Sequence, residues 1–168
     1  MAASTPTMWS IHAGETGDAE CLLLEHNYIA IGWAKMGHLG LLPNDKDAFK
    51  AKVEDAYPED AGGGSAQGAG QTRRFVYEMK IGDIVVYRPK APMKGTVPLL
   101  FLGRVAGPYL YNPYIQPGYP NLRRVEWLRS VPASQFSKHA LDEQAAWMSL
   151  SIIDEHAQEF LDALDGER

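Results

Sequence analysis

Five short runs of apolar, β-branched and aromatic residues, spread along most of the chain, constrain its fold more than any other feature. The runs occupy residues 8–13, 28–33, 84–87, 97–105 and 124–131. They have the length and composition of β-strands, and Gly or Pro follows most of them closely. Helices are expected at residues 15–26, 44–56, 71–79 and 152–164. This mixture predicts an α+β fold with a small, partly closed β-barrel of five or six strands and peripheral helices.

The length of 168 residues fits one well-packed domain. We expect a flexible N-terminus at residues 1–7, the domain at 8–150, and an acidic helix at 151–168. That helix either packs on the domain or leads to a missing partner domain. Residues 61–70 are small except for Gln67 and have no charge or aromatic ring, and we expect a flexible loop there.

A single cysteine, Cys21, excludes an internal disulfide, so a cytoplasmic location is the simplest expectation. Cys21 lies in an apolar run and is expected in the core. No apolar stretch is long enough to span a membrane, so we expect no membrane partner. The sequence makes no prediction of the oligomeric state.

The charge is distributed unevenly along the chain. Residues 73–138 hold 11 Lys and Arg against three acids, a net charge of +8. The remainder holds 5 Lys and Arg against 18 acids, a net of −13, which together give the overall −5. A basic middle between acidic ends is compatible with a surface that faces phosphates, and also with basic residues on exposed strands.

Several motifs resemble one group of proteins. The first two resemble the N-terminal domain of Mrr-like restriction endonucleases: Trp9-Ser10-Ile11-His12-Ala13-Gly14-Glu15 and Ile29-Ala30-Ile31-Gly32-Trp33. The third is similar both to those proteins and to the EVE domain: Glu78-Met79-Lys80-Ile81-Gly82-Asp83-Ile84-Val85. Two later stretches resemble strands of EVE and YTH domains: Phe101-Leu102-Gly103-Arg104-Val105-Ala106-Gly107 and Val125-Glu126-Trp127-Leu128-Arg129-Ser130-Val131-Pro132.

The resemblance implies a PUA-like fold of the EVE/YTH type, in which a flipped, modified base enters a cage of aromatic side chains. Carried over to this sequence, the pocket positions are His12, Ala13, Gly14 and Trp33. The EVE pattern has a basic residue and then a hydroxyl residue where this chain has His12 and Ala13, so a hydroxyl contact from this strand is not implied. Gly32, directly before Trp33, lacks a side chain and would let a planar ligand approach.

The motifs do not place a second wall of the cage. Trp9 and Trp127 are pocket candidates, although their mid-strand positions favour the core. Trp147 is expected in a helix with a structural role. A Pro- and Gly-rich loop offers further rings, which either line the pocket, stack on neighbouring bases or pack within the loop: Tyr109, Tyr111, Tyr114 and Tyr119.

The phosphate-binding candidates are basic residues expected in loops, at helix starts and on strands: Arg73, Arg74, Arg88, Lys90, Lys94, Arg104, Arg123 and Arg124. The predicted partner is DNA with a modified base, or RNA, together with a possible nuclease domain or subunit. The predicted function is therefore a non-catalytic reader that targets a restriction or defence nuclease.

We identify no catalytic constellation, metal site or cofactor motif. The nuclease pattern of an acid followed by a strand that carries Glu/Asp-x-Lys is not found, the five His lack metal-ligand spacing, and one cysteine excludes a Cys-rich zinc site. Three alternatives stay open. They are an RNA-binding module, a small nucleotide-acting enzyme that uses His12 or His38, and a small-molecule sensor that binds a free nucleoside.

Overall fold

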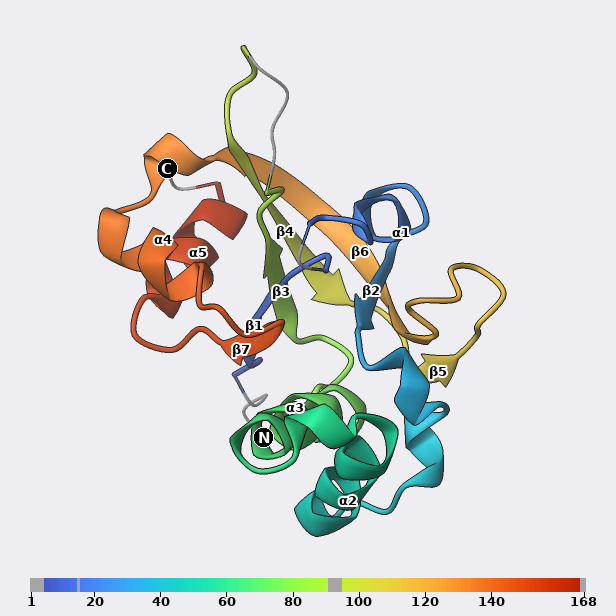
Figure 1. Ribbon diagram of the computed structural model, residues 1–168. Helices are drawn as coiled ribbons and strands as arrows, with labels where there is room; N and C mark the ends of the chain where they lie inside the picture. Colours follow the sequence, from blue (N-terminus) through green and yellow to red (C-terminus); the bar gives the residue numbers. More distant parts are fainter. Residues whose placement is uncertain (1–4, 15, 91–94, 167–168) are drawn as a thin grey trace.

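A computed structural model describes residues 5–14, 16–90 and 95–166 and contains one curled, mixed sheet (Figure 1). The strand order is β2-β6-β4-β3-β1-β7, and β5 pairs with β6 beside this path. The sheet forms a half-barrel with helices around it, which confirms the predicted α+β, partly closed barrel. Its seven strands within the described residues are β1 (Met8–Ile11), β2 (Tyr28–Ile31), β3 (Ile84–Tyr87), β4 (Leu99–Val105), β5 (Leu110–Tyr111), β6 (Asn121–Pro132) and β7 (Leu150–Ile152).

The helices form two groups around the sheet. In Figure 1, α4 and α5 lie together on one side of the sheet, whereas α2 and α3 lie at one end of the molecule. The α-helices are α1 (Glu20–Leu24), α2 (Lys46–Ala56), α3 (Gly63–Arg73), α4 (Lys138–Gln144) and α5 (Ala157–Leu164). A π-helical turn, η4 (Arg74–Glu78), continues α3, and short 3₁₀ turns are η1 (Ala34–Met36), η2 (Leu39–Leu41), η3 (Pro58–Asp60) and η5 (Ala133–Gln135).

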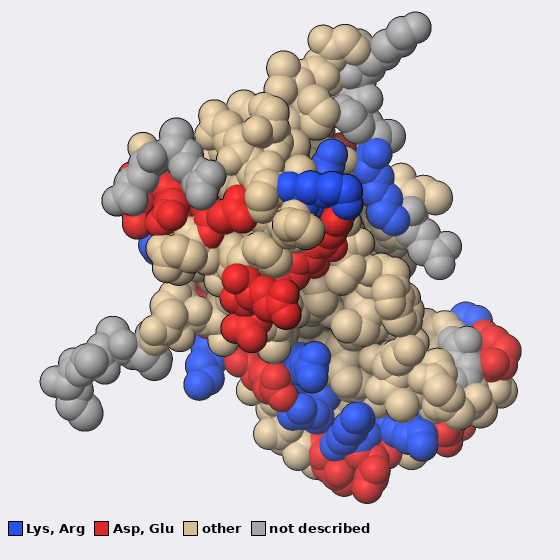
Figure 2. All heavy atoms as spheres, turned by 90° about the vertical axis from the view of Figure 1, so that its left-hand side faces the viewer, with Lys and Arg blue, Asp and Glu red and all other residues tan. Residues whose placement is uncertain are grey.

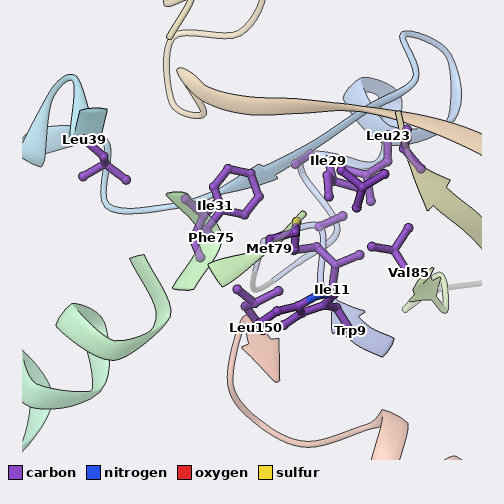
Figure 3. Close-up of a cluster of buried hydrophobic side chains, with 14 of the residues drawn as sticks. Trp9, Ile11, Leu23, Ile29, Ile31, Leu39, Phe75, Met79, Val85 and Leu150 are labelled. Atoms are coloured by element: carbon purple, nitrogen blue, oxygen red, sulfur yellow. The ribbon is translucent and has the colours of Figure 1, made fainter. Parts of the chain in front are cut away.

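Both faces of the central strands are buried. On one face, Trp9 and Ile11 of β1 join Val85 of β3 in the larger core, which Figure 3 shows. On the other face, Met8 and Val86 pack in a second core beneath α4 and α5. This alternation follows from the period of two along a strand, and it explains why β3 is a continuous apolar run.

The strand β1 lies between β3, to which it runs parallel, and β7, to which it runs antiparallel. A predicted boundary after residue 150 falls inside β7, so residues 150–152 belong to the same sheet as β1. The helix predicted from residue 151 onward instead begins at Ala157, where α5 buries Phe160 against the second core. The alternation of Leu150, Ser151 and Ile152 is a strand pattern that the helical assignment overlooked.

The largest error concerns residues 61–70, which are helical from Gly63 onward and not a flexible loop. They form most of α3, and the helix buries Ser65, Gly68, Ala69 and Thr72. Small side chains permit close helix packing, so a segment without large apolar residues can still be held by its neighbours.

Two smaller corrections concern caps and the N-terminus. The N-cap of α2 is Asp45, whose side chain accepts a hydrogen bond from the amide of Asp47, and not Asn44. Of the seven residues predicted to be flexible, residues 1–4 lie outside the described residues. Thr7 is tied to the sheet, because its amide donates to Asp83 Oδ1 at 3.1 Å and its carbonyl accepts from the amide of Ile84.

Candidate functional site

A cavity of about 230 Å³ opens beside the ends of β1 and β2. It brings together four residues predicted for the pocket, namely His12, Gly14, Gly32 and Trp33. The remaining lining residues are Ala30, Tyr119 and Ser149, so the cavity has walls from distant parts of the chain. The arrangement therefore places two aromatic side chains and two glycines around one space.

Trp33 has a backbone conformation that is unusual for a tryptophan. Its φ of 61° and ψ of 43° are left-handed, a region that disfavours bulky side chains and typically costs about 1–3 kcal/mol. The indole is half-buried, and one part of it packs on Gly68 of α3. A Cβ atom at Gly68 would lie 2.9 Å from Nε1 of Trp33, so the glycine is required for this contact. Strain of this kind often accompanies binding sites.

Tyr119 supplies the second aromatic side chain of the cavity. Its hydroxyl donates to Asp18 Oδ2 at 2.7 Å, which holds the ring beside the end of β1. Gly14 makes this possible, because a Cβ atom there would lie 2.2 Å from the Tyr119 hydroxyl and 2.0 Å from Asp18 Oδ1. The φ of +81° at Gly14 also favours glycine.

The imidazole of His12 lines the same cavity and has a defined polarity. Its Nε2–H donates to the carbonyl of Ala146 at 2.8 Å, and a carbonyl can only accept. Burial lowers the pKa of His12, and the nearby Lys90 acts in the same direction against the opposing effect of the Ala146 bond. The ring is therefore neutral at pH 7, with its lone pair on Nδ1.

A second cavity of about 160 Å³ adjoins the first and shares His12, Gly14 and Ser149 with it. Lys90 and Trp147 line its other part, together with Ala145 and Ala146. Trp147 lies in a bend after α4 and is 76% exposed, so the prediction of a structural helix residue is wrong. Tyr119 was one of four loop tyrosines considered for the pocket, and the motifs did not single it out. The separation in sequence explains this, and it also explains why Trp147 was not selected for the site.

Five other predicted pocket positions do not line the first cavity, and three of them are tryptophan or alanine. Trp9 is 1% exposed, and its Nε1–H donates to Asp83 Oδ2 at 2.9 Å. Ala13 is also a core residue. Trp127 donates from Nε1 to the carbonyl of Leu23 at 2.8 Å and packs on Gly103, where a Cβ atom would lie 2.7 Å from the indole. The structure therefore places these three side chains away from the first cavity, with Trp9 and Ala13 in the core and Trp127 partly buried against it.

Tyr109 and Tyr111 lie around His38 instead. Tyr111 stacks on the His38 ring with centroids 4.9 Å apart, and Tyr109 lies 5.8 Å from it. The Tyr109 hydroxyl donates to Asn121 Oδ1, and burial raises its pKa to about 12. Both tyrosines therefore form a packed aromatic cluster outside the two cavities.

The structure contradicts the prediction that Arg123 binds phosphate. Arg123 is 5% exposed, and its guanidinium donates to the carbonyls of Phe75, Val76 and Gly107 at 2.9, 3.0 and 3.2 Å. A buried cation with three backbone acceptors anchors η4 to the sheet. Its neighbour Arg124 is exposed and lies over the ring of Tyr28 at 5.4 Å.

The other basic candidates occupy several surfaces. Arg73 pairs with Glu78 at 2.5 Å, and Arg74 lies 3.8 Å from the same carboxylate. Arg104 is exposed on β4 opposite Glu126, whereas Arg88 is half-buried beyond β3. Lys94 lies outside the described residues. On the face shown in Figure 2, basic and acidic side chains are interspersed, so this face is not uniformly basic.

One further prediction is corrected. Cys21 is exposed and not in the core, and its Sγ lies 3.2 Å from Glu25 Oε2.

None of the helices in the described part of the chain is long and apolar enough to cross a membrane. The described residues also contain no group of three or more His, Cys, Asp or Glu placed to hold a metal ion.

Fold and site together define an α+β half-barrel protein with an aromatic cavity at the end of two strands. A family model described as a domain of unknown function (DUF8426) matches residues 9–153, and the chain belongs to this family. The matched region includes all residues of both cavities. No curated protein and no solved structure matches the chain.

Proposed function

We propose that this protein is a DNA-binding reader that holds an extruded, modified base in the larger cavity and selects the target of a restriction or defence nuclease. The observation that carries the proposal is the pairing of Trp33 and Tyr119 around a space beside Gly14 and Gly32. Half-buried aromatic rings at a cavity can stack on a planar guest, whereas fully buried rings cannot.

The energetics of such binding are balanced. Extruding a base costs a few kcal/mol, least for a damaged or mispaired base. Stacking on an aromatic side chain returns about 1–3 kcal/mol per base. Two rings in one cavity can therefore offset the extrusion, and contacts with the phosphates add a salt-sensitive contribution.

Polar groups at the cavity supply a means of selection. The neutral His12 ring offers an acceptor at Nδ1, since its Nε2–H already donates to Ala146. A base that presents an N–H group to this acceptor is favoured over one that presents a carbonyl. Ser149, which also lines the cavity, has a hydroxyl group that both donates and accepts.

The sequence resemblance to EVE and YTH domains supports the same function from an independent direction. Of the four positions that it selects, His12, Gly14 and Trp33 line the larger cavity, whereas Ala13 is a core residue. Exposed or partly exposed cations supply the phosphate contacts under this proposal: Arg88, Lys90, Arg104 and Arg124.

The test is a titration of labelled duplexes carrying 5-methylcytosine, 5-hydroxymethylcytosine or N6-methyladenine, followed by fluorescence anisotropy at fixed salt. We expect at least one modified duplex to bind more tightly than the unmodified duplex. Trp33→Ala and Tyr119→Ala should each abolish that preference. Tyr114→Ala is the matched control, because Tyr114 belongs to the same loop as Tyr119 and is 93% exposed outside both cavities.

Equal affinity for all duplexes would refute the reader function. A single-stranded RNA that outcompetes every DNA would indicate an RNA-binding module. Binding of a free nucleoside without dependence on salt would indicate a small-molecule sensor.

A further inference from the structure

We propose that the second cavity holds the nucleotide next to the extruded base, with its base stacked on Trp147 and its phosphate at Lys90. This inference rests on the proposed function and specifies the ligand as at least a dinucleotide. Nothing in the proposed function requires it, since a single base would occupy only the larger cavity.

The two cavities share part of their walls. His12, Gly14 and Ser149 line both of them, with Trp33 and Tyr119 at one end and Trp147 and Lys90 at the other. If the base in the larger cavity belongs to a polynucleotide, the sugar-phosphate chain must leave the cavity and run over the surface beside it. The surface over the three shared residues provides such a path.

The segment that carries Trp147 is firmly attached to β1. The Ser10 hydroxyl donates to the carbonyl of Gln144 at 2.5 Å, and the His12 ring donates to Ala146 at 2.8 Å. The His12 amide also donates to the carbonyl of Ser149 at 3.0 Å. Three hydrogen bonds to one strand thus flank an indole that is mostly in water.

An exposed indole on a fixed segment is suited to stacking. Tryptophan presents a large, flat surface at a low cost in conformational entropy, and every base has a face to place on it. By contrast, the indole of Trp9 is buried and that of Trp127 is partly buried against the core, and both donate to protein acceptors. Among these three tryptophans, Trp147 has the most exposed ring.

The charge of the second cavity fits a phosphate. Lys90 lines it, and its positive charge is close enough to lower the pKa of His12. Because His12 is neutral, it adds no second positive charge to the wall that the two cavities share. A phosphate group next to Lys90 would complement the positive charge of this side chain.

The test compares oligonucleotides that carry the best-binding modified base from the panel above, with an abasic site placed on either side of it. For the wild-type protein, an abasic site on one of the two sides should weaken binding by about five- to a hundred-fold, the loss expected for one stacked base. Trp147→Ala should bind the intact oligonucleotide with the same loss and should become indifferent to that abasic site. Trp147→Phe should recover part of the affinity.

Lys90→Gln provides a second, independent readout. The slope of log affinity against log salt should fall by about one unit, as for the loss of one phosphate contact. Tyr114→Ala, with an exposed ring outside both cavities, should match the wild type in both experiments. Circular dichroism should show unchanged unfolding for Trp147→Ala, because the indole is mostly in water.

The outcomes separate the two proposals. If Trp33→Ala abolishes modified-base preference while Trp147→Ala binds like the wild type, only the neighbouring-nucleotide site is refuted. Equal losses from an abasic site on both sides that persist in Trp147→Ala would refute it as well. If no oligonucleotide in the panel binds with a preference, both proposals are wrong.

Discussion

Replacement of Gly68 by alanine tests whether α3 is shaped around Trp33. Gly68 is a buried residue of α3, and an added Cβ atom would lie 2.9 Å from Nε1 and 3.3 Å from Cε2 of Trp33. Gly70 lies in the same helix, and a Cβ atom there would meet no atom within 4 Å. The pair therefore separates helix propensity from contact with the indole.

The magnitudes follow from these two environments. Gly70→Ala should stabilise the protein by about 0.5–1 kcal/mol, since glycine is unfavourable in a helix. Gly68→Ala gains the same helix stabilisation. However, the distance from its new Cβ atom to Nε1 of Trp33 must increase from 2.9 Å to at least 3.4 Å for an ordinary contact, so the indole must move. Overpacking of this kind costs about 1–3 kcal/mol, so Gly68→Ala should be at least ~1 kcal/mol less stable than Gly70→Ala.

Thermal unfolding followed by circular dichroism resolves this difference, because 1 kcal/mol shifts the midpoint of a chain this size by about 2–4 °C. The anisotropy titration described above should also show weaker binding of the modified duplex to Gly68→Ala alone, since the displaced indole changes the cavity. If Gly68→Ala matches Gly70→Ala in both midpoint and binding, the proposed fit between α3 and Trp33 is wrong.

Three further predictions concern other parts of the molecule. Arg123→Leu should lower the free energy of unfolding by more than about 3 kcal/mol in urea titrations, because three backbone carbonyls lose their donors. Arg124→Leu should lower it by less than about 1 kcal/mol, because this side chain is exposed. Equal losses would contradict the anchor role of Arg123. The hydrogen bond to Glu25 raises the pKa of exposed Cys21, so a disulfide reagent near neutral pH should modify Glu25→Gln faster than the wild type, and an unchanged rate would contradict this. Burial lowers the pKa of His12 in the folded protein below its ordinary value of 6.5. As the pH falls below 6.5, the unfolded chain therefore takes up a proton at His12 before the folded protein does, and the folded state loses stability. Urea titrations should show this decrease in the free energy of unfolding, and His12→Gln should show a smaller one.

Local patterns were sufficient for five of the seven described strands, because apolar alternation and flanking Gly or Pro act within a few residues, whereas the short strands β5 and β7 were missed. They were insufficient for α3, whose Gly-rich segment has poor intrinsic helix propensity and depends on contacts with distant residues. The contact between Gly68 and Trp33 links positions 35 residues apart, and no local pattern records it. Tertiary packing therefore decided an element that composition assigned to a loop.

The site could be predicted only in part for a similar reason. Residue type does not distinguish a tryptophan that donates inward, such as Trp9, from one left in water, such as Trp147. Likewise, Arg123 is buried and Arg124 next to it is exposed, because successive residues of a strand point to opposite faces. The alternation along β6 would therefore have predicted that Arg123 is buried, once the buried face of this strand was recognised.

The position of β1 between β3 and β7 has a consequence for biosynthesis. The first strand to leave the ribosome cannot complete its pairing until residues 150–152 emerge, since these form its second neighbour. The same late segment supplies Ser149 and Trp147, so a nascent or truncated chain would have neither a finished sheet nor the two complete cavities. Under the proposed function, only chains that extend past these residues would bind the ligand, and shorter ones would expose the apolar faces that chaperones and proteases recognise.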